Sequence, residues 1–177
     1  MKLDFLKITS HERMPISILS LYLLAFPADE RRPCQNLFAL IDGAEPAFDF
    51  RVINFDGRLA GFVTTWDSGD FVYVEHFATL DHMRGHGIGG RAIELLQQEA
   101  GKPLLLEVEL PASGPMAQRR IDFYCRHGLV PRYSFSYMQP PYAAGLNALP
   151  MVLMTSADID LDKARDFLYK RVYAVRS

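Results

Sequence analysis

The chain has 177 residues and a net charge of −2, and 49% of its residues are hydrophobic and 23% charged. This composition fits one globular domain, residues 1–177, and the lack of a long basic run argues against a nucleic-acid partner. Two cysteines, Cys34 and Cys125, are too few for a secreted disulfide scaffold and favour a reducing, cytoplasmic setting. The apolar run at 16–26 is too short to span a bilayer, so we expect a buried helix and no membrane association.

The first part of the chain combines strand and helix patterns. Residues 3–8 suit an edge strand, and the helix that Pro15 can open should end before Pro27. The charged connector 28–33 is interpreted by default as a solvated loop. The functional alternative for this segment is a lip that contacts the substrate. A second, short helix is expected at 35–41.

Three strands are expected next, at 48–55, 59–65 and 71–78. The pair Asp56-Gly57 lies between the first two and is a strong signal for a tight hairpin. These strands therefore predict an antiparallel meander.

A helix at 88–100 follows, with its apolar residues spaced to form one buried face, at Ile88, Ala92, Leu95 and Leu96. The next strand is expected at 104–110. A helix between two strands of one sheet predicts a right-handed βαβ crossover and a parallel pair. A helix at 117–127, strands at 133–139 and 150–155, and an amphipathic helix at about 159–173 complete the pattern.

The stretch between the third strand and its helix holds four glycines in six residues, at Gly85, Gly87, Gly89 and Gly90. Glycine allows a close backbone approach and a positive φ. The unpaired N–H groups and the dipole at a helix start attract anions. A strand, a glycine loop and a helix start in this order predict a site for a pyrophosphate, with His86 beside it.

A dinucleotide site is one candidate, because Gly85 to Gly90 satisfies G-x-G-x-x-G and Glu107 lies where a ribose-binding acid would be expected. The spacer 80–84 after the strand, the preceding meander and the lack of a second mononucleotide-binding half argue against it. A Walker A loop is excluded, because no Lys-Ser or Lys-Thr follows the glycines.

The alternative motif is Arg84-x-x-Gly87-x-Gly89, and with it the sequence resembles the GNAT superfamily of acyl-CoA-dependent N-acetyltransferases. EHFATLDHMRGHGIGGRAIELL is similar to the family's strand, loop and helix block, LLLEV to its fifth strand, and IDFYCRHGL to its FY-x-x-x-GF block. The segment PASGPMAQRR lacks the Asn that members often carry there. The resemblance implies an α/β fold with a mixed, mostly antiparallel sheet and helices on both faces.

The resemblance also implies a cofactor and a reaction. Acetyl-CoA would be the cosubstrate, without a metal, and its acetyl group would pass to a primary amine by direct attack. The residues expected to bind it are Phe77, Ala78, Thr79, Arg84, Gly85, His86, Gly87, Ile88, Gly89 and Gly90. Backbone N–H groups at 77–79 would stabilise the oxyanion. His76 and His86 lack a third ligand at useful spacing, which argues against a metal site.

Three side chains are candidates for proton transfer. Tyr124 matches the family's catalytic tyrosine and would protonate the leaving thiolate, although a helix tyrosine can also simply pack in the core. Glu107 and Glu75 compete as the base that deprotonates the amine, whose pKa near ~10.4 keeps it protonated at pH 7. The alternatives are a strand carboxylate paired with an Arg, and a water relay.

The acceptor, a small-molecule or peptide amine, would be shaped by 24–35, 111–117 and 140–150. Arg31, Arg32 and Arg119 or Arg120 would suit an acidic acceptor, but such arginines are more often solvated. The aromatics at 133–142 would suit an acceptor cleft or a homodimer face, and core or interface packing is favoured. A catalytically silent acyl-CoA sensor remains an alternative to an enzyme, because of the missing Asn and the uncertain base.

Overall fold

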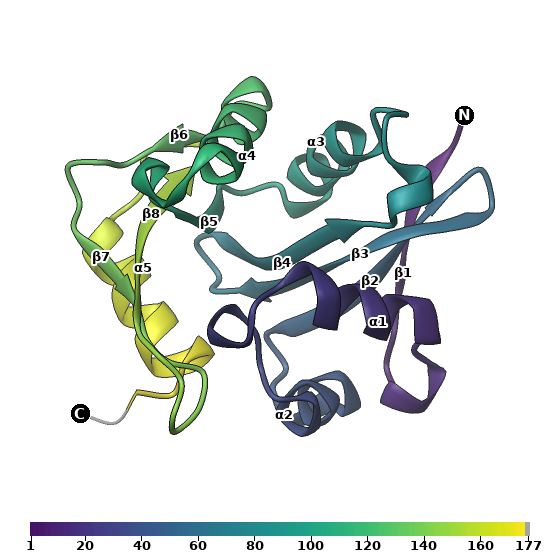
Figure 1. The fold of residues 1–177 in the computed structure, drawn as a ribbon, viewed down its shortest axis with the longest axis horizontal. Coiled ribbons are helices and arrows are strands. Elements are labelled where there is room, and N and C mark those ends of the chain that lie inside the picture. The colour runs from purple at the N-terminus through teal and green to yellow at the C-terminus, as the bar shows by residue number, and fades with distance from the viewer. Residues whose placement is uncertain (176–177) are drawn as a thin grey trace.

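The computed structural model of the chain describes residues 1–175 and is built around a central sheet of eight strands (Figure 1). The strand order is β1-β2-β3-β4-β5-β8-β6, with β7 also paired to β8. Among the strands of residues 1–175, only β4 and β5 pair in parallel, so the predicted mixed, mostly antiparallel sheet is confirmed. The strands are β1 (Leu3–Lys7), β2 (Phe48–Phe55), β3 (Arg58–Asp67), β4 (Val72–Thr79), β5 (Leu104–Glu109), β6 (Val130–Pro131), β7 (Tyr137–Gln139) and β8 (Leu149–Thr155).

Helices cover both faces of the sheet. Figure 1 shows α3 and α4 on one face and α1 and α2 on the other. A π-helical turn follows α2 at Leu40–Ala44 and another follows α5 at Leu168–Val172. The helices are α1 (Ile16–Ala25), α2 (Cys34–Ala39), α3 (Ile88–Ala100), α4 (Pro115–Arg126) and α5 (Leu161–Phe167).

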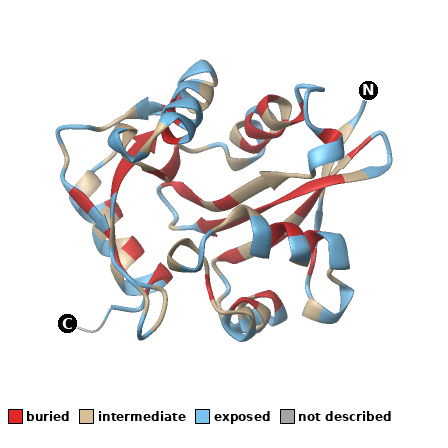
Figure 2. Cartoon of the chain, viewed as in Figure 1, coloured by how far each residue is buried: buried red, intermediate tan, exposed pale blue. Residues whose placement is uncertain are grey.

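Hydrophobic cores lie on both faces of the sheet, which explains the buried residues along nearly every central strand (Figure 2). Because side chains of a strand alternate between faces, β5 sends Leu105 into the core with α1, α2 and α5 and Leu106 into the core with α3 and α4. Glu107 and Glu109 continue the face of Leu105.

The hairpin between β2 and β3 confirms the turn predicted at Asp56-Gly57. Asp56 has φ 48° and Gly57 has φ 75°. Two successive positive φ angles are those of a type I′ turn, whose twist matches that of the flanking strands. The turn fixes the register that carries β3 into the centre of the sheet.

β4 is irregular at the point where the site forms. Thr64 pairs with His76 and Thr65 pairs with Val74, so Glu75 is the extra residue of a β-bulge. β4 and β5 pair only through Val72–Val74 and Leu104–Leu106. Beyond these pairs β5 continues along β8 and β4 continues along β3, so a gap opens inside the sheet.

The strand predicted at 133–139 is wrong over its first half. Only Tyr137–Gln139 forms a strand, because the Phe135 N–H donates to the carbonyl of Arg132 in a turn. The Phe135 ring lies 5.8 Å from the guanidinium of Arg165 on α5. Phe135, one of the aromatic residues that favoured a strand, therefore packs against the last helix instead.

Gly61 on β3 provides a test of the β3–β4 packing. A Cβ added there would lie 2.2 Å from the carbonyl oxygen of Ala78. Gly61→Ala should therefore lower the free energy of unfolding by about 1–3 kcal/mol, measured by urea titration. Gly57→Asn, at an open turn position, is the control and should cost less than about 1 kcal/mol. An unchanged Gly61→Ala protein would contradict the close contact.

Candidate active site

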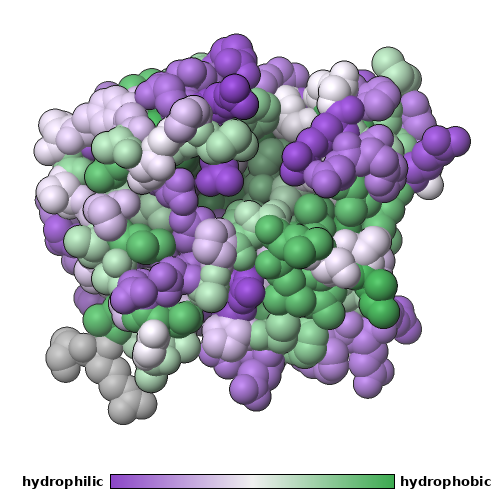
Figure 3. Space-filling view, in the orientation of Figure 1, coloured by the Kyte–Doolittle hydropathy of each residue, from purple (hydrophilic) through white to green (hydrophobic). Residues whose placement is uncertain are grey.

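The gap between β4 and β5 opens into a cavity of about 370 Å³. Its wall combines residues from both faces of the sheet, from Phe123 and Tyr124 of α4 to Ala25 of α1 and Phe26 after it. In the space-filling view a hollow lies on this side of the molecule, between α4 and the part that carries α1 and α3 (Figure 3). The three segments expected to shape an acceptor each supply a wall residue, namely Phe26, Met116 and Tyr142.

The free edge of β4 offers hydrogen-bond donors to this cavity. The N–H of Leu80 donates to the carbonyl of Ala60 at 2.8 Å, and the N–H of His76 donates to Thr64 Oγ1 at 3.0 Å, so both face β3. Successive N–H groups alternate between the edges of a strand, which turns those of Phe77 and Thr79 toward the gap. Ala78 lines the cavity, but by the same alternation its N–H points toward β3 and not toward the gap.

The glycine loop ends at the start of α3. Gly85 has φ 81° and Gly87, the N-cap of α3, has φ 69°, so both need the left-handed conformation that glycine allows. Among the loop residues, Arg84 and Gly89 reach the cavity wall. The first-turn N–H groups of α3 have no partner within the helix, which suits an anion there.

Two residues of the loop also have packing roles. Ile88 is 2% exposed and lies in a core with Ile53 and Ala92. A Cβ on Gly90 would lie 2.4 Å from the imidazole of His127 on α4, so Gly90 allows α3 and α4 to approach. The Ile88 side chain is therefore buried away from the cavity and Gly90 has none, so only the backbone of these two residues could bind a phosphate.

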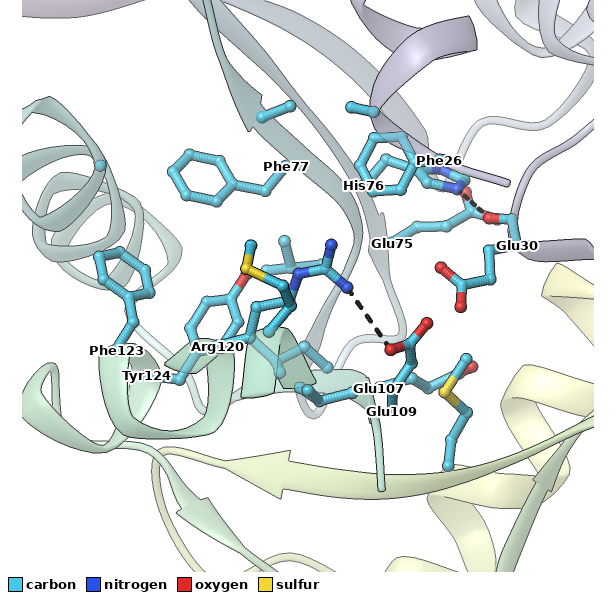
Figure 4. A pocket seen from close by; sticks show the side chains of 18 of the residues that line it. Phe26, Glu30, Glu75, His76, Phe77, Glu107, Glu109, Arg120, Phe123 and Tyr124 are labelled. Atoms are coloured by element: carbon cyan, nitrogen blue, oxygen red, sulfur yellow. Dashed lines mark hydrogen bonds and ion pairs between the residues drawn. The ribbon is translucent and has the colours of Figure 1, made fainter. Parts of the chain in front are cut away.

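Tyr124 projects from α4 toward the gap, beside Phe123 and Phe77 (Figure 4). Burial raises the pKa of its hydroxyl to about 12, and Arg120 only partly offsets this. The phenol is therefore protonated near neutral pH, which is the state a proton donor needs.

Glu75 is held in a dense set of contacts. Its side chain is 1% exposed and accepts hydrogen bonds from Arg32 Nη2 at 2.6 Å, Trp66 Nε1 at 2.8 Å and Tyr142 Oη at 3.0 Å. Burial opposes its ionisation, but Arg32 and the Trp66 hydrogen bond together lower the pKa of the carboxyl. Glu75 is therefore ionised and paired with Arg32, the arrangement foreseen as the structural alternative to a base.

Glu107 lies across the gap in a different environment. It accepts hydrogen bonds from three tyrosine hydroxyls, at 3.0 Å from Tyr73, 3.0 Å from Tyr137 and 2.8 Å from Tyr173. Burial raises the pKa of the carboxyl to about 7 although these hydrogen bonds oppose the shift. A carboxyl that titrates near neutrality and faces the cavity can accept a proton at physiological pH.

Sequence reasoning did not identify Glu30, His76 and Glu109, which line the cavity, as site residues, and it named Arg120 only as one of the arginines that would suit an acidic acceptor. Burial and the nearby Glu109 raise the pKa of Glu30 to about 8. Glu30 belongs to the connector 28–33, whose alternative interpretation as a lip was the available signal. The other available signal was the spacing of Glu107 and Glu109, which are two residues apart and therefore lie on one face of the strand.

The sequence matches the model of the Acetyltransferase (GNAT) family over residues 16–129. A solved GNAT-family protein from Bacteroides thetaiotaomicron is 36% identical, with a TM-score of 0.88 and coverage of 98% of this chain and 99% of that one. The chain therefore belongs to the GNAT family of acetyltransferases. No curated protein matches its sequence.

More distant structures share the fold. The Salmonella typhimurium protein yncA, solved with its cofactor acetyl-CoA, is 15% identical, with a TM-score of 0.58 and coverage of 90% of this chain and 97% of that one. A Bacillus subtilis acetyltransferase in complex with CoA is 13% identical, with a TM-score of 0.56 and coverage of 89% and 100%.

The fold disfavours the dinucleotide interpretation of the glycine loop. The loop follows the fourth strand of a mostly antiparallel sheet, not the first strand of a doubly wound parallel one. Within residues 1–175, no three potential metal ligands come together, and no helix there is long and apolar enough to cross a membrane.

The Arg32–Glu75 pair provides a stability test. Arg32→Met should lower the free energy of unfolding by about 3–5 kcal/mol, because it leaves a buried carboxylate without its partner. The deficit should shrink as the pH falls from 7 to 5, since the pKa of the unpaired carboxyl rises and it can take a proton. Chemical denaturation at both pH values measures this.

Arg119→Met is the matched control, because Arg119 is exposed on α4 and outside the cavity; it should change stability by less than about 0.5 kcal/mol. Equal losses of unfolding free energy for the two substitutions would show that the buried Arg32–Glu75 pair contributes no more to stability than an exposed arginine does.

Proposed function

We propose that this chain is an acetyl-CoA-dependent N-acetyltransferase that acts on a primary amine by direct attack on the thioester. One observation carries the proposal: a single cavity joins the free edge of β4 and the start of α3 to a tyrosine on one face of the sheet and a carboxyl of raised pKa on the other. This arrangement holds the donors, the acid and the base around one gap.

The residues present fit acetyl-CoA. The first-turn N–H groups of α3 and the Arg84 guanidinium would hold the pyrophosphate. The N–H groups of Phe77 and Thr79, unmatched on the gap side of β4, would bind the amide groups and the acetyl oxygen. When bound, acetyl-CoA supplies the activated acetyl group. The same N–H groups would stabilise the negative charge that develops on the acetyl oxygen.

The two proton transfers would be divided between the faces of the sheet. Glu107, directly or through a water, would take the proton of the attacking ammonium, because its pKa of about 7 leaves it partly ionised at neutral pH. Tyr124 would return a proton to the leaving sulfur. Glu75, ionised and paired with Arg32, would not accept the proton of the amine.

Tyr124→Phe separates an enzyme from a silent acyl-CoA sensor. We expect kcat, followed by free-thiol release with a panel of amines, to fall about 10²- to 10⁴-fold, because the leaving thiolate loses its acid. The affinity for CoA, measured by calorimetry, should stay unchanged. A wild-type protein that binds CoA but releases no thiol with any amine would favour the sensor, and one that binds neither CoA nor acetyl-CoA would overturn both.

The pH dependence tests the role of Glu107. For the wild type, kcat/KM should rise as the pH increases through about 7, since the carboxyl becomes ionised there, and level off above it. Glu107→Gln should be slow and should lose this rise. A wild-type rise retained by Glu107→Gln would instead assign the base to another group or to water. Glu99→Gln, on α3 outside the cavity, is the control and should keep the wild-type profile.

A further inference from the structure

One end of the cavity gathers more carboxyl groups than cations. We call it the acceptor end and define it by Phe26, Glu30, Glu107, Glu109 and Tyr142. Figure 4 shows Glu30 and Glu109 approaching each other from opposite walls. The nearby cation is Arg120, which is 4.0 Å from Glu109 and has a side chain that is 46% exposed. The carboxyl groups of Glu30, Glu107 and Glu109 thus share one solvated guanidinium. Glu75 is not counted with them, because its charge is balanced by Arg32.

A buried acceptor atom adjoins the same end. His76 is 2% exposed and lines the cavity, and its Nε2 lies 2.8 Å from the carbonyl oxygen of Glu30. A carbonyl can only accept, so Nε2 carries the proton and Nδ1 is the acceptor. Burial lowers the pKa of His76, which keeps the ring neutral. Nδ1 has no partner among residues 1–175, and a buried acceptor of this kind calls for an N–H or O–H donor.

The spacing of the carboxyls sets the length of a fitting ligand. Glu107 and Glu109 share one face of β5 and lie two residues apart, which places their Cα atoms about 6.5–7 Å apart. Glu107 is at the gap, where the reacting amine must arrive, and Glu109 is farther along with Glu30. The rings of Phe26 and Tyr142 flank His76 in this end, with centroid distances of 4.7 Å and 6.0 Å, and offer a wall for a carbon chain.

We propose that the acceptor is a linear aliphatic diamine, whose reacting amine lies at Glu107 and whose second, protonated amine binds between Glu30 and Glu109. This inference rests on the proposed acetyltransferase function. The step moves one acetyl group: the free amine nitrogen forms a bond to the acetyl carbon and releases one proton, the carbon–sulfur bond breaks, and sulfur takes a proton from Tyr124, whose phenolate is reprotonated by the proton that nitrogen releases. The second amine keeps its charge throughout.

An acidic acceptor fits this end poorly. Arg32, one of the arginines that would suit an acidic acceptor, is already paired with Glu75. Arg31 donates a hydrogen bond from Nε to the carbonyl of Phe26 at 3.0 Å. A carboxylate on the substrate would meet Glu30 and Glu109 as like charges. Burial, and after it the nearby Glu109, raise the pKa of Glu30, and a bound cation would lower it.

The test compares three acceptors of one length: 1,4-diaminobutane, 1-aminobutane and 4-aminobutanoate. With wild-type protein and acetyl-CoA, free-thiol release should give a kcat/KM about 10- to 100-fold higher for the diamine than for 1-aminobutane, and lowest for 4-aminobutanoate. In Glu30→Gln and Glu109→Gln the ratio of diamine to monoamine should fall toward one. Glu12→Gln, which removes an exposed charge outside the cavity, should keep the wild-type ratio.

The wild-type comparison decides the matter even if a variant fails to fold. Equal kcat/KM for diamine and monoamine, or a preference for 4-aminobutanoate, would overturn the diamine proposal and leave the acetyltransferase function intact. A protein whose Tm rises with acetyl-CoA but that acetylates none of the three, nor any amine of a wider panel, would overturn the function and the diamine proposal together.

Discussion

The separation of β4 from β5 after three residue pairs is the constraint on which the rest of the site depends. Inside a sheet, backbone donors and acceptors normally satisfy one another, and an unpaired strand edge there is costly unless another group pairs with it. The bulge at Glu75 turns β4 away, while β5 remains attached to β8 through Glu107 and Glu109. The sheet thereby keeps its continuity at one end and offers a free edge at the other.

The same separation places two carboxyls in contrasting surroundings. Glu75 faces a guanidinium and stays ionised, whereas Glu107 faces only hydroxyls and holds its proton until near neutral pH. Each is fixed by residues far away in the chain, Arg32 for one and Tyr173 for the other. The difference in pKa between these two like groups therefore follows from long-range packing and not from their positions on the strands.

The sequence predicted those parts of the protein that local chemistry determines. The Asp56-Gly57 turn, the α3 helix after its glycines and the parallel β4–β5 pair all follow from periodicity and backbone preference. The strand expected at Tyr133 failed because aromatic residues favour a strand and a helix-packing surface alike. Glu30 and His76 were missed because their roles depend on a cavity between segments that are 46 residues apart.

Trp66 gives the site a built-in optical probe. It is the only tryptophan in the sequence, it is 1% exposed, and its indole N–H donates to the carboxylate of Glu75. The Arg32 guanidinium lies 5.4 Å from its ring. Indole emission responds to nearby charges and hydrogen bonds, and in this protein it arises from a single chromophore in contact with Glu75, which lines the cavity. Ligand entry can therefore be followed in the unlabelled protein, without turnover and without a background from other indoles.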